Sequence, residues 1–121
     1  MSLVLIVEDE ETLRTAEARF LRRVGFDVRE AATGRQGVEA ALTEPVPDAI
    51  LMDIMLPELN GVQATRLIRQ DPRTAHVPVI ACTGAALGPL SIESAGFVRV
   101  LQKPFTLAAL LDVVQAHLPA A

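Results

Sequence analysis

The chain has 121 residues, half of them hydrophobic, with four phenylalanines and no tryptophan or tyrosine. This length suits one domain with an aliphatic core of its own, and the composition excludes a disordered chain. The formal net charge of −4 argues against a nucleic-acid surface, because such surfaces concentrate Lys and Arg. The single cysteine, Cys82, excludes a disulfide framework and a cysteine-based metal cluster.

Neither a membrane span nor a secretion signal is expected. No apolar run approaches the length that crosses a bilayer, and residues 1–7 lack the length and the cationic start of a signal peptide. The sequence therefore predicts a soluble cytoplasmic protein.

The first apolar run, 3–7, is continuous, which is typical of a strand covered on both faces. A helix is predicted next over 10–24. Acidic residues open it, and two arginines followed by Gly25 close it, as the helix dipole and a glycine stop favour. The apolar residues at helical spacing in this segment are Leu13, Ala16, Phe20, Leu21 and Val24.

The same alternation of strand and helix then repeats four times. Further strands are predicted over 26–30, 48–53, 77–82 and 98–101, the first of them near a sheet edge. Further helices are predicted over 34–42, 61–70, 89–95 and 107–118. Asn60 and Thr106 can cap two of these helices. The helix over 34–42 is weakened by Gly37, and the one over 89–95 is short or irregular.

Five strand–helix units indicate an α/β fold, in which a five-stranded parallel sheet is flanked by about five helices. In such sheets the site lies beyond the carboxyl ends of the strands, at a point where the strand order reverses. The residues that end or follow the predicted strands are therefore the candidates for function.

Charged and hydroxyl side chains occupy these strand ends, namely Glu8, Asp9, Asp53, Thr83 and Lys103. Carboxylates about 4 Å apart repel by roughly 4 kcal/mol at an effective dielectric constant near 20, so cations must offset them. Lys103 supplies one positive charge, and a site made of oxygen ligands suits Mg²⁺. A carboxylate nucleophile, a metal, a lysine and a hydroxyl donor together make a phosphoryl-transfer site.

Four segments carry these residues in order: Val7-Glu8-Asp9-Glu10, Asp53-Ile54-Met55-Leu56-Pro57 with Asn60-Gly61, Thr83-Gly84, and Lys103-Pro104-Phe105. Together they resemble the receiver domains of response regulators in two-component signalling. The resemblance covers essentially the whole chain. It implies a single receiver domain over 1–121 with the flavodoxin-like strand order 2-1-3-4-5.

The resemblance also implies a phosphorylation site. Asp53 would accept a phosphoryl group from a phosphohistidine on a sensor histidine kinase or a histidine phosphotransfer protein. Asp9, Asp53 and the main-chain carbonyl of Met55 would ligate Mg²⁺, with Glu8 acting through water. Such a domain is a switch and not an enzyme, since it catalyses only its own phosphorylation and slow dephosphorylation.

Thr83 and Lys103 would contact the phosphoryl oxygens, and the Lys103–Pro104 peptide bond would be cis. The resemblance assigns conformational switching to Thr83, Val100 and Pro104. It also implies a surface for a second copy or an effector, formed by 89–95, 98–101 and 107–118, with no direct binding of nucleic acid or membrane.

Two features depart from the family pattern, namely Val100 and the segment from Thr83 to Gly96, which is about two residues shorter than usual. Val100 stands where receivers usually carry Tyr or Phe, so no ring can swing there. We therefore predict that output uses loop and backbone shifts near 83–90. Met55 and Ala85 occupy the positions that tune dephosphorylation, and neither can orient an attacking water. The acyl phosphate is therefore predicted to be long-lived.

Three other functions fit parts of the pattern. A phosphatase of the haloacid dehalogenase type also uses an aspartate nucleophile, but it needs an acid two positions on, where Met55 stands. A flavodoxin-like cofactor binder needs a phosphate loop after the first strand, where this chain is acidic. A receiver that has lost phosphorylation and acts only as a binding module would keep the fold.

Overall fold

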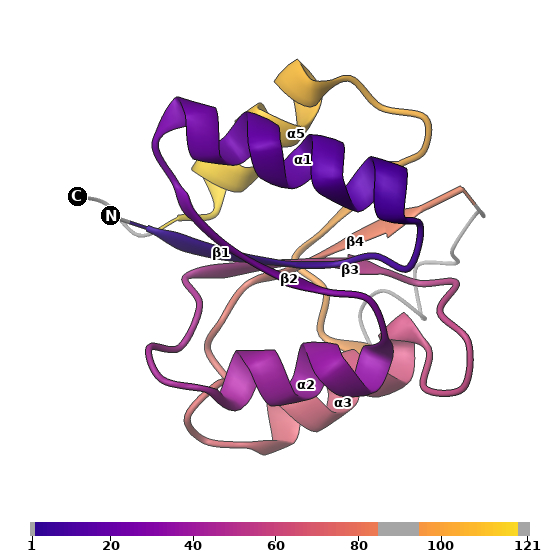
Figure 1. Ribbon diagram of the computed structural model, residues 1–121. Coiled ribbons are helices and arrows are strands. Elements are labelled where there is room, and N and C mark those ends of the chain that lie inside the picture. Colours follow the sequence, from indigo (N-terminus) through magenta and orange to yellow (C-terminus); the bar gives the residue numbers. More distant parts are fainter. Residues whose placement is uncertain (1, 85–94, 119–121) are drawn as a thin grey trace.

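The computed structural model describes residues 2–84 and 95–118, and these contain five strands and four helices (Figure 1). The strands are β1 (Leu3–Val7), β2 (Asp27–Ala31), β3 (Ala49–Asp53), β4 (Val79–Thr83) and β5 (Arg99–Gln102). The helices are α1 (Glu11–Val24), α2 (Gly34–Leu42), α3 (Gly61–Gln70) and α5 (Leu107–Ala116). The count is four rather than about five because the predicted helix over 89–95 lies almost wholly outside the described residues.

All five strands are parallel and follow the order β2-β1-β3-β4-β5, which confirms the predicted topology. Figure 1 shows α1 and α5 on one face of the sheet and α2 and α3 on the other. Every residue of β3 and β4 is buried, whereas β2 and β5 are partly exposed at the two edges. This burial follows from the position of each strand, since only central strands are covered on both faces and both sides.

Successive side chains of each strand point to opposite faces and fill two separate cores. Ile50 and Met52 pack in the core beneath α2 and α3, whereas Leu51 packs in the core beneath α1 and α5. The same alternation places Asp53, two residues beyond Leu51, on the α1–α5 face. Cys82 belongs to this core and lies opposite Asp53 in the β3–β4 register.

Local capping bonds fix where the helices begin. Glu10 caps α1 by accepting hydrogen bonds from the N–H groups of Thr12 and Leu13 at 3.2 and 2.9 Å. Asn60 and Gln63 form a reciprocal capping box at the start of α3. Thr106 caps α5, so both predicted caps are confirmed.

The apolar stripe predicted for α1 is partly wrong. Ala16 and Val24 are exposed, and the buried positions of this helix include Glu17. Leu13, Glu17 and Leu21 are spaced four residues apart and therefore form one line along the helix. Because Glu17 is charged, the hydrophobic pattern did not identify this line as the buried face.

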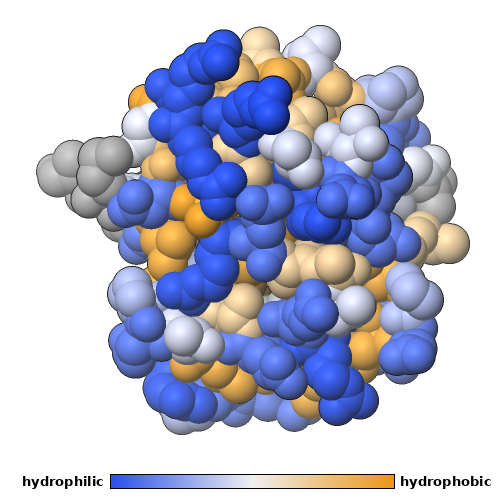
Figure 2. Space-filling model, in the orientation of Figure 1, coloured by the Kyte–Doolittle hydropathy of each residue, from blue (hydrophilic) through white to orange (hydrophobic). Residues whose placement is uncertain are grey.

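The exterior seen in Figure 2 is mostly hydrophilic, with hydrophobic residues scattered between the polar ones. Within 2–84 and 95–118, no helix combines the length and the apolar character that crossing a bilayer requires.

Gly61 begins α3 directly against the end of β3. A Cβ at this position would lie 2.1 Å from the main-chain oxygen of Asp53 and 2.8 Å from the Cα of Ile54. Gly61→Ala must therefore push α3 away from the strand that carries Asp53. We expect the free energy of unfolding to fall by about 1–3 kcal/mol, measured by urea denaturation.

Gly84→Ala is the matched control for this substitution. Among the described residues, a Cβ at Gly84 would meet only the Cβ of Lys103, at 4.0 Å. An equal loss of stability in the two variants would show that the contact with Asp53 is not the cause.

Candidate functional site

Three carboxylates meet at the carboxyl ends of the neighbouring strands β1 and β3. Glu8 and Asp9 follow β1, and Asp53 ends β3, which pairs directly with β1. One oxygen of each carboxylate lies within 4.8 Å of the others. Glu8 and Asp53 are 3% and 4% exposed, whereas Asp9 is exposed to solvent. Among the described residues this is the one group of three or more acidic, His or Cys side chains close enough to share a metal ion.

Lys103 reaches the carboxylates from the loop between β5 and α5. Its Nζ lies 2.6 Å from Oε1 of Glu8 and 3.6 Å from Oδ1 of Asp53. Burial opposes the charge of the ammonium group, but the hydrogen bond to Glu8 and the charges of Asp53 and Glu8 outweigh it. The pKa of Lys103 is therefore raised, and the side chain is a fixed cation beside two buried anions.

Main-chain N–H groups hold the carboxylates of Glu8 and Asp53, and the Arg14 side chain holds the main chain of Glu8. Oε2 of Glu8 accepts a hydrogen bond from the N–H of Glu10 at 3.1 Å, and its main-chain oxygen accepts one from Arg14 at 2.8 Å. Oδ1 of Asp53 accepts one from the N–H of Met55 at 3.2 Å. Sequence reasoning missed Arg14, since an arginine in the first half of a helix carries no signal of such a contact.

The residues assigned to switching lie on β4, on β5 and directly after Lys103. Thr83 is fully buried, and its main-chain oxygen accepts a hydrogen bond from the N–H of Lys103 at 2.8 Å. Val100 lies opposite Ala81 in the β4–β5 register and packs against the core beneath α2 and α3. The Lys103–Pro104 peptide bond is cis, as predicted.

Glu17 is a second residue near this site that sequence reasoning missed. It is 2% exposed on the inner side of α1. Burial, followed by the charges of Glu8 and Asp53, raises its pKa to about 7, although Lys103 partly opposes this. Its four-residue spacing from Leu13 and from Leu21 was the available signal.

The single cysteine is a packing residue. Cys82 is 4% exposed, and burial raises the pKa of its thiol. The thiolate form is therefore disfavoured.

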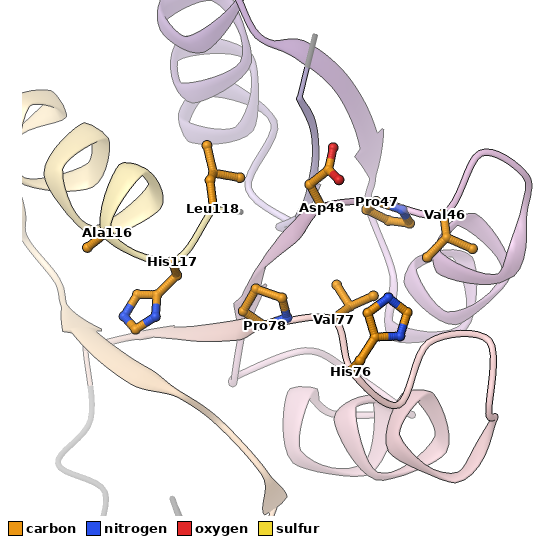
Figure 3. Close-up of a pocket in the computed structure, with 9 residues that line it drawn as sticks. All are labelled: Val46, Pro47, Asp48, His76, Val77, Pro78, Ala116, His117 and Leu118. Atoms are coloured by element: carbon orange, nitrogen blue, oxygen red, sulfur yellow. The ribbon is translucent and has the colours of Figure 1, made fainter. Parts of the chain in front are cut away.

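A hollow of about 610 Å³ lies at the opposite end of the sheet, where β3 and β4 begin and α5 ends (Figure 3). Residues that line it are Val46, Pro47, Asp48, His76, Val77, Pro78, Ala116, His117 and Leu118. In the view of Figure 3, Pro78 lies between the two imidazoles, and these residues form no metal-binding group in the described part of the chain. His76 is exposed, whereas His117 is partly exposed and its Nε2 atom is buried without a hydrogen-bond partner among the described residues.

The fold and the acidic site at its carboxyl edge define a signalling switch of the flavodoxin-like α/β class. A family model described as the response regulator receiver domain matches residues 4–115. The chain belongs to this family and is a receiver domain of two-component signalling.

Curated relatives agree with this assignment. The chain is 34% identical over 122 aligned positions to the DNA-binding dual master transcriptional regulator RpaA of Synechocystis, covering 98% of this chain but only 49% of RpaA. It is 30% identical over 117 positions to the polar-differentiation response regulator DivK of Brucella ovis, covering 95% of this chain and 94% of DivK.

Solved structures show the same fold. The chemotaxis protein CheY4 of Vibrio cholerae superimposes with a TM-score of 0.91 at 26% identity, covering 98% of this chain and 99% of CheY4. The receiver domain of the sensor histidine kinase PA1611 of Pseudomonas aeruginosa superimposes with a TM-score of 0.86 at 38% identity, covering 96% of both chains. That structure is described with a magnesium ion coordinated in its active site cleft.

Proposed function

We propose that Asp53 accepts a phosphoryl group from a phosphohistidine on a sensor histidine kinase or a histidine phosphotransfer protein. The observation that carries the proposal is the convergence of Asp53 with Glu8, Asp9 and Lys103 at one edge of the sheet. A buried carboxylate held by a main-chain N–H and faced by an ammonium group suits a nucleophile in phosphoryl transfer.

In the proposed step a carboxylate oxygen of Asp53 attacks the phosphorus atom, the phosphorus–nitrogen bond breaks, and the donor imidazole keeps the electron pair. The N–H of Met55 orients the carboxylate. Lys103, already 3.6 Å from Oδ1, would neutralise phosphoryl oxygens, and Thr83 would donate a hydrogen bond to them. Once Asp53 carries the phosphoryl group, the phosphoryl oxygens give Lys103 a new partner in place of Glu8.

The donor set fits Mg²⁺. Three carboxylates facing one ammonium leave an excess of two negative charges, and all the available ligand atoms are oxygens, which Mg²⁺ prefers. Asp9, Asp53 and the main-chain carbonyl of Met55 would hold the ion, with Glu8 acting through water. When bound, Mg²⁺ supplies positive charge that offsets the charge of the phosphoryl oxygens.

Labelling by acetyl phosphate tests the phosphorylation site. We expect the wild-type chain to gain one phosphate in the presence of Mg²⁺ and none after chelation, measured by intact mass. Asp53→Asn should gain none, because it lacks the nucleophilic oxygen. Asp112→Asn removes the same charge from an exposed position of α5 and should label like wild type.

Equal labelling of Asp53→Asn and wild type would contradict the proposal. Absence of label in the wild type under donor excess would instead favour the binding module without phosphorylation. The phosphatase is disfavoured because its nucleophile follows the first strand, whereas Asp53 ends β3.

The wider role follows from the same family membership. We propose that residues 1–121 form one cytoplasmic receiver domain, a switch rather than an enzyme with an external substrate, in which Thr83, Val100 and Pro104 change conformation. A second copy or an effector would bind over β5 and α5. Direct binding of nucleic acid is not proposed, because the chain has a net charge of −4 and spans only half of the DNA-binding relative.

A further inference from the structure

Met55 presents a thioether to solvent beside the phosphorylation site. Its side chain is 68% exposed, whereas the other exposed large hydrophobic side chains of the described residues are 38–44% exposed. Met52, three residues earlier in the same segment, is 0% exposed. Met55 is therefore accessible to small oxidants, and Met52, which is buried in the core, serves as its internal control.

The Met55 side chain also lies at the mouth of the site. Its own N–H donates to Oδ1 of Asp53 at 3.2 Å. With Asp9 and Asn60, among others, it lines a hollow of about 580 Å³. A chemical change at the sulfur therefore takes place in a hollow that Asp9 also lines, on the residue whose N–H is bonded to Asp53.

We propose that Met55 is a modification site, at which hydrogen peroxide oxidises the thioether to a sulfoxide and so shortens the lifetime of phosphorylated Asp53. The sulfur attacks one peroxide oxygen, the oxygen–oxygen bond breaks, and a sulfur–oxygen bond forms. Sulfur loses two electrons, and the peroxide is reduced to water. The effect on lifetime rests on the proposed function of Asp53.

Competing targets in the described part of the chain are protected. Met52 is inaccessible in the folded protein. Cys82 is 4% exposed, and its raised thiol pKa keeps it out of the thiolate form that reacts with peroxide. Within residues 2–84 and 95–118, reaction at low peroxide is thus directed to Met55.

The change in chemistry accounts for the change in lifetime. A thioether is a weak hydrogen-bond acceptor and cannot hold an attacking water. A sulfoxide oxygen is a strong acceptor and can orient a water toward the acyl phosphate. We expect the lifetime to shorten by about 2- to 10-fold, which is the factor that one hydrogen bond of ordinary strength supplies.

Peptide mapping tests the modification itself. The folded chain is treated with hydrogen peroxide, quenched and digested, and the gain of one oxygen is quantified on the peptides that carry Met52 and Met55. We expect Met55 to oxidise first in the folded chain and both residues to oxidise alike in denaturant. Equal rates for the two residues in the folded chain would overturn the assignment.

Decay of the acyl phosphate tests the consequence. Treated and untreated samples of wild type, Met55→Leu and Met52→Leu are phosphorylated with acetyl phosphate and Mg²⁺, the donor is removed, and loss of phosphate is followed. Each variant is compared with its own untreated sample. We expect peroxide to shorten the lifetime in wild type and Met52→Leu but not in Met55→Leu, and methionine sulfoxide reductase to restore it in wild type.

The outcomes separate the two proposals. A chain that oxidises at Met55 with no change in lifetime overturns this inference and leaves phosphorylation at Asp53 intact. An untreated chain that takes up no phosphate overturns the proposed function and, with it, the effect on lifetime. A peroxide response that persists in Met55→Leu assigns the effect to another residue.

Discussion

Replacing Glu17 by leucine will stabilise the folded protein by roughly 3 kcal/mol at about pH 8 when divalent ions are chelated. Glu17 is 2% exposed, and its pKa is raised to about 7 from an ordinary value of 4.5. At alkaline pH the folded chain must therefore hold a desolvated carboxylate near Glu8 and Asp53. Leucine removes this cost and fills the line between Leu13 and Leu21 with apolar surface.

The pH dependence has a definite sign. Between pH 4.5 and 7 the folded state binds more protons at Glu17 than the unfolded state does. The contribution of Glu17 to stability is therefore fully present below its unfolded pKa and is lost as the pH rises through its folded pKa. Wild-type stability should fall across this window by an amount that the Glu17 variants do not show.

Urea denaturation between pH 4 and pH 8 measures this effect. Glu17→Gln should remove the same pH slope as Glu17→Leu but stabilise less, because a buried amide still needs hydrogen-bond partners. Glu39→Gln is the control, since it removes a carboxylate from an exposed position of α2 and should keep the wild-type slope. An unchanged slope in Glu17→Gln would show that another group takes up the proton.

Replacing Lys103 by methionine will have the second large effect, on both stability and phosphorylation. The ammonium group is bonded to Glu8, whose side chain is 4% exposed, and faces Asp53, whose side chain is 6% exposed. Removal of the cation leaves buried carboxylates without a counter-charge, which costs roughly 3–5 kcal/mol when one partner of a buried pair is lost. The rate of labelling at Asp53 should also fall by about 100-fold or more. The variant lacks the ammonium group that would stabilise the negative charge of the phosphoryl oxygens in the transition state.

Divalent ions separate the two roles of Lys103. Because Mg²⁺ offers charge to the same carboxylates, saturating Mg²⁺ should restore part of the lost stability but not the rate of labelling. Denaturation with and without the ion and time courses with acetyl phosphate measure the two quantities. Arg73→Met is the control, because it removes a cation from the exposed pair with Asp71 and should change neither. Wild-type stability in Lys103→Met would mean that the buried carboxylates do not depend on this ammonium group.

Much of the fold could be predicted from the sequence, because the signals for strands and helix starts lie within a few neighbouring residues. Apolar runs bounded by polar residues predicted the strands, and the caps Asn60 and Thr106 predicted two helix starts, since a cap acts through the N–H groups of its own first turn. The exact ends of the strands were predicted less accurately. The strand predicted over 77–82 is observed at Val79–Thr83, because pairing with its neighbours, and not hydrophobicity, decides where a strand stops.

The candidate site could also be predicted in outline. Parallel strands bring their carboxyl ends to one edge, so carboxylates far apart in sequence were expected to meet, and Glu8, Asp9 and Asp53 do so. The pairing of Lys103 with Glu8 at 2.6 Å was not predicted, because the path of the loop after β5 selects the acceptor.

The sequence by itself determined the order of the elements, the helix caps and the set of residues at the strand ends, since each depends on chemistry within a few neighbouring positions. Only the tertiary structure decided that Glu17 is buried, that Arg14 supports Glu8, and that Nε2 of His117 is buried without a hydrogen-bond partner among the described residues. Burial and long-range contacts arise from which faces of different elements pack together. The local spacing of Leu13, Glu17 and Leu21 marks one shared helix face, but it does not record which element covers that face.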